Sequence, residues 1–147
     1  EGGLKIIKIF KILIKNKIPV MGHLGIMPQF TKGKFKSKGK SAKEKKEIIR
    51  DSKLLEDAGA FSIVLECVEK NLAKEITNSI RIPTIGIGSS HNCDGQVLVT
   101  DDILGLTDAK IKFVKKYANI RKIINSAVSK FKQEVKSGKY PTKKYSY

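Results

Sequence analysis

Apolar residues along this chain follow two kinds of pattern, and the two kinds alternate. In one, apolar residues recur three and four positions apart, which is typical of an amphipathic helix. In the other, apolar and β-branched residues follow one another in short runs, which is typical of a strand in a parallel sheet. We expect helices over residues 4–16, 42–58, 69–80 and 112–138, and strands over residues 18–24, 61–68, 82–88 and, as a short extended piece, 96–99.

The second expected helix carries signals at both ends. Ser41 and Glu44 are spaced as in a capping box, in which the hydroxyl accepts from a backbone N–H and the carboxylate reaches back. Gly59 suits the residue after a helix, and the face between these ends buries Ile48, Leu55 and Ala58. The preceding segment, 28–40, has no apolar period, so we expect a long loop there, which in a compact domain indicates function or mobility.

The fourth expected helix, 112–138, is the longest. Its apolar positions recur at helical spacing and would form one buried face. These positions are Val114, Tyr117, Ile124, Ala127, Val128, Phe131 and Val135, and Gly138 marks the end.

Strands and helices alternate without a hairpin signal between them. Such alternation predicts parallel βα units and an α/β fold. No low-complexity linker interrupts the pattern, so we expect one domain over residues 1–147.

Glu66 lies near the carboxyl end of strand 61–68, which we expect to be buried on both faces. A buried carboxylate costs several kcal/mol unless it is paired or used. Chemistry in α/β barrels is placed at the carboxyl ends of strands. Two interpretations follow: Glu66 turns out of the sheet to bind a nearby lysine, or it takes part in a reaction.

His23 and the glycine-rich turn 86–95 are the other candidates on this edge. Gly22 and Gly25 flank His23 and leave room beside the imidazole. Because each strand is followed by a glycine-bearing turn, we expect His23, Glu66 and the turn 86–95 to lie along one rim and form a proton-transfer site. The alternative is that His23 only hydrogen-bonds a loop and that the glycines only ease packing.

The charge balance is strongly basic, with 30 Lys and Arg against 14 Asp and Glu, a net charge of +16. Such a charge suits a nucleic-acid or anionic-membrane partner only when it is clustered. Here the lysines are spread along the whole length, so we expect neither nucleic acid nor membrane as a partner. The run 6–14 is interrupted by Lys8 and Lys11 and is neither a membrane span nor a signal peptide.

Cys67 and Cys93 are the two cysteines of the chain. They are too few and too isolated for a disulfide framework or a zinc site. Reduced thiols and a cytoplasmic protein are the simplest interpretation.

Four motifs in order carry a family resemblance: residues 20–29 (VMGHLGIMPQ), 64–68 (VLECV), 82–88 (IPTIGIG) and 94–99 (DGQVLV). Together with the tail 137–141 (SGKYP), they resemble the ketopantoate hydroxymethyltransferases, which are 3-methyl-2-oxobutanoate hydroxymethyltransferases. Glu1-Gly2-Gly3 is similar to the end of the family motif Lys-Ile-Glu-Gly-Gly. The resemblance covers nearly the whole chain and implies that the chain is the C-terminal half of a larger enzyme.

The resemblance implies a (β/α)8 TIM barrel that transfers a hydroxymethyl group from 5,10-methylenetetrahydrofolate to 3-methyl-2-oxobutanoate. The product is 2-dehydropantoate, in pantothenate biosynthesis, and the route is an enolate stabilised by Mg²⁺. By the same resemblance, Glu66 is the proton acceptor, His23 positions a partner or shuttles a proton, and Glu1 is a metal ligand. It also implies a homo-oligomer of complete subunits, and it leaves the folate-binding residues unassigned.

Three departures from the family pattern concern the substrate side. Met27 stands where the family usually has Thr, Asp101 stands where it has His, and the loop 30–40 is shortened and rich in lysine. Two other classes stay open: a different Mg²⁺-dependent 2-oxo-acid lyase or aldolase barrel, which would not need folate, and a basic nucleic-acid-binding module. We also expect that the 147 residues alone are inactive, because part of the site would be absent.

Overall fold

The computed structural model describes residues 2–30, 36–108 and 110–147. Two compact units are present, residues 1–97 and residues 98–147. Among the described residues, the first holds the sheet and three α-helices, and the second holds two further α-helices. The single domain expected over residues 1–147 stays a prediction.

A four-stranded parallel sheet forms the centre of the first unit, with its strands in chain order. Helices connect the first three strands, whereas the third and fourth strands are joined by a turn alone. The strands are β1 (Met21–Gly25), β2 (Ser62–Glu66), β3 (Thr84–Ile87) and β4 (Gly95–Gln96). The helices are α1 (Ile7–Lys15), which follows the short 3₁₀ turn Leu4–Ile6, then α2 (Ala42–Asp57) and α3 (Lys70–Ser79). The prediction of an α/β fold with parallel strands is confirmed, and the arrangement is consistent with part of a TIM barrel.

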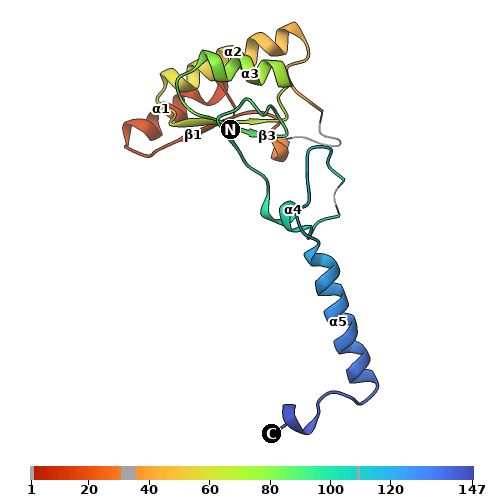
Figure 1. Cartoon of the computed structure of the whole chain (residues 1–147). Helices are drawn as coiled ribbons and strands as arrows, with labels where there is room; N and C mark the ends of the chain where they lie inside the picture. Colours follow the sequence, from red (N-terminus) through yellow and green to blue (C-terminus); the bar gives the residue numbers. More distant parts are fainter. Residues whose placement is uncertain (1, 31–35, 109) are drawn as a thin grey trace. The chain divides into compact units, whose positions relative to one another are not determined.

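The three helices cover one face of this sheet (Figure 1). The side chains between sheet and helices form the core, and Leu55, Ile63, Leu65, Leu72 and Ile76 are completely buried there. Burying side chains of this size stabilises by about 1.5–3 kcal/mol each. This layer fixes the sheet against the helices.

The other face of β2 is covered less completely, so the prediction that the strand is buried on both faces holds for one face only. Val64 and Glu66 are partly exposed, while Ile63 and Leu65, which alternate with them, are fully buried. Because successive side chains of a strand point to opposite faces, Val64 and Glu66 share the less covered face. Glu66 therefore lies on the side of the sheet that the helices leave open.

The predicted helix signals before α2 are confirmed, with one change of partner. The Ser41 hydroxyl accepts from the Glu44 N–H at 3.2 Å. The Glu44 carboxylate accepts from the N–H of Gly39 at 3.1 Å, two residues earlier than a capping box requires. Gly59 follows the helix with a φ of 96°, as the sequence predicts. The first turn of α2 therefore also fixes the backbone at Gly39, in the segment that precedes the helix.

In the second unit, the expected helix 112–138 is shorter than predicted. A five-residue helix, α4 (Thr100–Leu104), comes first, and the long helix is α5 (Ile120–Lys136). The prediction began eight residues too early because Asn119 was not recognised as a cap; its side chain accepts from the Lys122 N–H at 3.1 Å. Within the described residues, no helix is long and apolar enough to cross a membrane.

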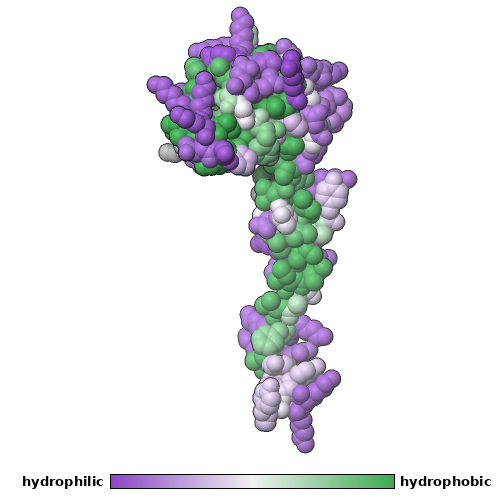
Figure 2. Space-filling model, turned by 90° about the vertical axis from the view of Figure 1, so that its left-hand side faces the viewer, coloured by the Kyte–Doolittle hydropathy of each residue, from purple (hydrophilic) through white to green (hydrophobic). Residues whose placement is uncertain are grey.

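The predicted burial of the apolar face of α5 is wrong for this structure. No residue of α5 is buried, and Val128 and Phe131 are 59% and 53% exposed. Figure 2 shows the resulting hydrophobic surface along the helix. The periodicity therefore predicts the helix and its apolar stripe, but not a covering element.

Candidate active site

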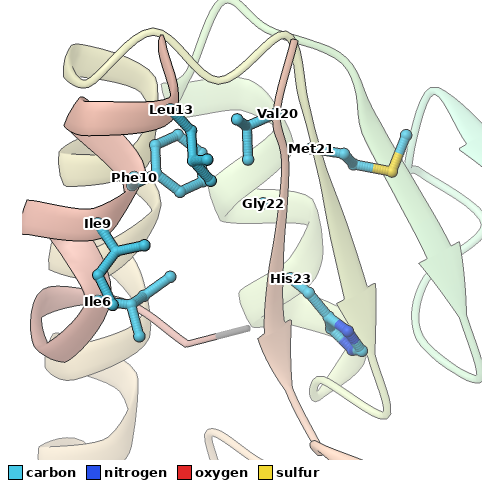
Figure 3. A pocket seen from close by; sticks show the side chains of 8 residues that line it. All are labelled: Ile6, Ile9, Phe10, Leu13, Val20, Met21, Gly22 and His23. Atoms are coloured by element: carbon cyan, nitrogen blue, oxygen red, sulfur yellow. The ribbon is translucent and has the colours of Figure 1, made fainter. Parts of the chain in front are cut away.

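Two of the predicted site residues meet at the carboxyl ends of β1 and β2. The Nε2 atom of His23 lies 3.1 Å from the Oε2 atom of Glu66. The strands are in parallel register, with Gly25 opposite Glu66 and His23 opposite Val64, so both side chains stand on the same face. The imidazole points away from α1 (Figure 3).

Both side chains are shielded but reachable. The side chain of His23 is 17% exposed and that of Glu66 is 12% exposed. A carboxylate in contact with an imidazole in such surroundings can accept a proton. The imidazole can hold the carboxylate in place, or it can take the proton from the carboxylate. The structure thus brings together the acid and the histidine that the sequence placed on one rim.

The backbone beside Glu66 is held by both neighbouring strand ends. The Glu66 carbonyl accepts from the N–H of Ile26 at 2.9 Å, and the N–H of Cys67 donates to the Ile87 carbonyl at 2.9 Å. Gly25 permits this close approach, because a Cβ at that position would clash with the Glu66 carbonyl oxygen. The peptide between residues 66 and 67 therefore joins three strand ends.

The turn predicted to complete the rim does so only at its beginning. Ile87 ends β3 beside Glu66. The chain then returns to the opposite end of β3, where Asp94 accepts from the backbone N–H of Thr84 at 2.8 Å and from its hydroxyl at 3.0 Å. These bonds lower the pKa of Asp94. Asp94 therefore fixes the start of β3 and lies away from Glu66.

Two pockets adjoin this region. One of about 250 Å³ lies between α1 and the edge of β1 (Figure 3). Its lining is apolar apart from His23 and comes from Ile6, Ile9, Phe10 and Leu13 and from residues 20–23. The second, of about 210 Å³, lies at the end of β1 and includes Glu44, Glu47 and Asp51 of α2. Neither pocket is lined by Glu66, so the geometry of the acid–histidine pair, and not the pockets, defines the candidate site.

The predicted metal ligand, Glu1, lies outside the described residues. The next residue, Gly2, donates its backbone N–H to the His23 carbonyl at 3.1 Å. Among the residues that the structure describes, no group of three or more His, Cys, Asp or Glu side chains is arranged to hold a metal ion. The described residues therefore do not form a metal site by themselves.

Sequence reasoning missed two features of the strand ends, one beside the pair and one at the opposite end of β3. Cys67 adopts a φ of 52°, a conformation that the presence of a cysteine does not predict. The bonds between Asp94 and Thr84 were also missed. A signal existed for that contact, because an aspartate before a glycine often bonds nearby backbone.

A parallel α/β sheet with a carboxylate–imidazole pair at its strand ends is typical of enzymes that transfer a proton to or from a small substrate. A sequence model of the family described as ketopantoate hydroxymethyltransferase matches residues 1–143. The chain belongs to this family.

Several curated relatives are named 3-methyl-2-oxobutanoate hydroxymethyltransferase. The protein of Pelagibacter ubique is 65% identical over 147 residues, which are 100% of this chain and 57% of the relative. One from Clostridium botulinum is 51% identical over 150 aligned residues, covering 100% of this chain and 54% of the relative. One from Caldivirga maquilingensis is 46% identical over 147 residues, covering 99% of this chain and 56% of the relative. The chain thus spans a little over half the length of these relatives.

Proposed function

We propose that the complete protein transfers a hydroxymethyl group from 5,10-methylenetetrahydrofolate to 3-methyl-2-oxobutanoate, giving 2-dehydropantoate. The observation that carries the proposal is the 3.1 Å contact between Glu66 and His23 in a chain of this family. Support also comes from the relatives, whose names give the same transfer and the same oxo acid.

In the proposed reaction, the Glu66 carboxylate takes the proton from C3 of the oxo acid. The electron pair of the broken C–H bond moves toward the C2 carbonyl, giving an enolate. C3 then forms a bond to the methylene carbon of the folate, whose C–N bonds break with their electrons passing to nitrogen. Water supplies the hydroxyl group and one proton, and the proton held by Glu66 is the second. These two protons go to the two nitrogens, so tetrahydrofolate leaves and Glu66 is again a carboxylate.

His23 has two possible parts in this scheme, and both follow from its contact with Glu66. The 3.1 Å contact between Nε2 and the Oε2 atom of Glu66 orients the carboxylate before the proton moves. An imidazole is also able to take the proton on and release it near neutral pH. Positioning of Glu66 or relay of its proton is therefore the proposed role of His23.

We also propose that the complete protein uses Mg²⁺ and that Glu1 is the one metal ligand that this chain supplies. Further carboxylate ligands would have to come from outside the described residues. We further propose a cytoplasmic homo-oligomer that acts on small molecules and binds no nucleic acid.

The test uses a chimeric enzyme, in which this chain replaces the matching 57% of the Pelagibacter ubique relative. We expect formation of 2-dehydropantoate that requires 5,10-methylenetetrahydrofolate. Glu66→Gln should lower kcat by about 10²–10⁴, the usual cost of losing a general base. Glu75→Gln, at an exposed carboxylate of α3, is the matched control and should have no effect.

Two results would contradict the proposal. Wild-type turnover by Glu66→Gln would remove the assigned base. Consumption of the oxo acid without folate would instead favour a 2-oxo-acid lyase or aldolase.

The isolated 147 residues provide a second prediction. We expect no transferase activity from them, and Mg²⁺ binding no tighter than that of a single carboxylate, because the described residues lack a metal site. Turnover by the purified, monomeric chain would refute this expectation.

A further inference from the structure

The residue after Glu66 has a backbone conformation that residues with a Cβ seldom adopt. Cys67 has a φ of 52°, in the left-handed region, where contact between Cβ and the backbone causes strain. Lys17, with a φ of 60°, is the only other non-glycine residue of the described chain in this region, and it lies in the exposed turn after α1. Cys67, in contrast, is buried.

Hydrogen bonds from three segments hold this turn. The peptide between residues 66 and 67 is bonded through its carbonyl to Ile26 and through its N–H to Ile87, both at 2.9 Å. The Cys67 carbonyl then accepts from the N–H of Lys38 at 2.8 Å. A strained conformation persists only where its surroundings determine it this completely.

The thiol itself does not account for the turn. Burial raises the pKa of the Cys67 thiol, and the neighbouring charge of Glu66 adds to the increase. The thiol is therefore protonated at neutral pH and is a poor nucleophile. What distinguishes residue 67 is its backbone, which sets the direction in which β2 ends.

We propose that the left-handed turn at Cys67 is a positioning device for Glu66. It fixes the last residue of β2, so that the carboxylate stays against His23 on the less covered face of the sheet. A residue 67 that left this conformation would rotate the following peptide and break its bond to Lys38. The inference rests on the proposed function, because it assigns a purpose to the placement of the proposed base.

The test compares glycine with alanine at two positions of the chimeric enzyme. Both substitutions remove the sulfur of Cys67, but only glycine removes the Cβ and frees the backbone. Because glycine relieves the left-handed strain, Cys67→Gly should melt no lower than Cys67→Ala. Because alanine leaves the left-handed conformation more readily than glycine, the kcat of Cys67→Ala for exchange of the C3 proton of 3-methyl-2-oxobutanoate with solvent deuterium should be up to about tenfold lower than that of Cys67→Gly, with KM unchanged, since small misplacements of a reacting group are costly.

Lys17 provides the matched control. Lys17→Gly and Lys17→Ala differ in the same strain, but they lie in an exposed turn that does not contact Glu66. Glycine should again melt no lower than alanine, and here the two exchange rates should be equal.

Two outcomes would overturn the inference. Equal kcat for Cys67→Gly and Cys67→Ala would show that the freedom of this backbone does not matter. A kcat or a melting temperature that is lower in Cys67→Gly than in Cys67→Ala would show that strain at residue 67 does not govern the position of Glu66.

A measurement independent of activity completes the test. Amide hydrogen exchange at residues 26 and 67 should be faster in Cys67→Ala than in Cys67→Gly, because alanine is strained in the left-handed conformation, and equal rates would overturn the inference. Its failure is distinguishable from failure of the proposed function. If Glu66→Gln abolishes deuterium exchange while the two Cys67 variants agree, only the positioning role is wrong; if Glu66→Gln exchanges at the wild-type rate, the proposed base is wrong.

Discussion

Helices α3 and α5 carry the same kind of amphipathic sequence, yet their apolar faces end in opposite surroundings. In α3, Leu72, Ala73 and Ile76 are completely buried. In α5, no residue is buried, and Val128 is 59% exposed. Each helix begins at a side chain that accepts from backbone N–H groups, Glu69 in α3 and Asn119 in α5.

The difference teaches that periodicity and capping determine a helix, whereas burial needs a second surface. For α3 that surface is the sheet of its own unit. Large exposed apolar patches on soluble proteins generally mark contact sites. The stability of α3 therefore comes from packing, and that of α5 comes from local interactions in this structure.

Amide hydrogen exchange of the 147-residue chain should separate the two helices most strongly. Exchange is slow where opening requires loss of buried contacts and fast where it does not. We expect the amides of α3 to exchange at least about tenfold more slowly than those of α5. Equal protection would mean that the apolar face of α5 is covered in solution.

Truncation of the α3 face should cost the most in stability. Leu72→Ala in the chimeric enzyme removes a completely buried side chain, and we expect a loss of about 2–5 kcal/mol in the free energy of unfolding. Lys74→Ala, at an exposed position of the same helix, should stay within about 0.5 kcal/mol. Urea denaturation of the two variants measures both, and similar losses would disprove the packing argument.

Removing a cap should have a smaller effect, and a different one in each unit. Ser41→Ala removes the bond to the Glu44 N–H, and we expect a loss of about 1 kcal/mol in the chimeric enzyme. Asn119→Ala removes the equivalent bond to Lys122 and should mainly lower the helicity of residues 120–136, measured by circular dichroism of the 147-residue chain. An unchanged helicity would show that α5 is stabilised by more than local interactions.

Acid should destabilise the first unit modestly through Glu69 and Asp94. Backbone N–H groups of Asn71 and Leu72 lower the pKa of Glu69, and the backbone N–H of Thr84 lowers that of Asp94. A carboxyl with a lowered folded pKa contributes stability above its unfolded pKa and loses it as the pH falls through the folded value. Unfolding free energies of the chimeric enzyme should therefore fall less between pH 7 and pH 3 in the variant Glu69→Gln/Asp94→Asn; the same fall as in the parent would contradict the assignment.

The smallest effect expected is on nucleic-acid binding. The lysines are spread along the whole sequence and are not clustered in one segment. We expect no micromolar binding of duplex DNA by the 147-residue chain at physiological salt, as measured by fluorescence anisotropy. Tight binding with a steep salt dependence would show that the charge of +16 has a partner after all.

The sequence predicted those features whose causes are local. Ser41 and Gly59 mark the ends of α2 as expected, because a cap and a left-handed glycine act over one helical turn. The parallel order of strands also followed from local pattern, since helices between strands force a crossover. Features that depend on distant segments were harder to predict.

The start of α5 was misplaced although its cause is local, because the apolar period alone does not reveal the cap at Asn119. Two features that depend on distant segments were missed. The turn after β3 folds back to Thr84 through Asp94, a contact across ten residues. The left-handed conformation of Cys67 is imposed by Ile26, Ile87 and Lys38, none of which is near it in sequence. The pairing of His23 with Glu66, in contrast, followed from placing both on strand ends.

The assignment of Glu66 as the proton acceptor is tested most directly by proton exchange without the folate. The chimeric enzyme is incubated with 3-methyl-2-oxobutanoate in deuterium oxide, and loss of the C3 proton is followed by NMR. We predict exchange by the parent and a rate lower by about 10²–10⁴ in Glu66→Gln, with KM little changed. Exchange at the parent rate in Glu66→Gln would contradict the assignment.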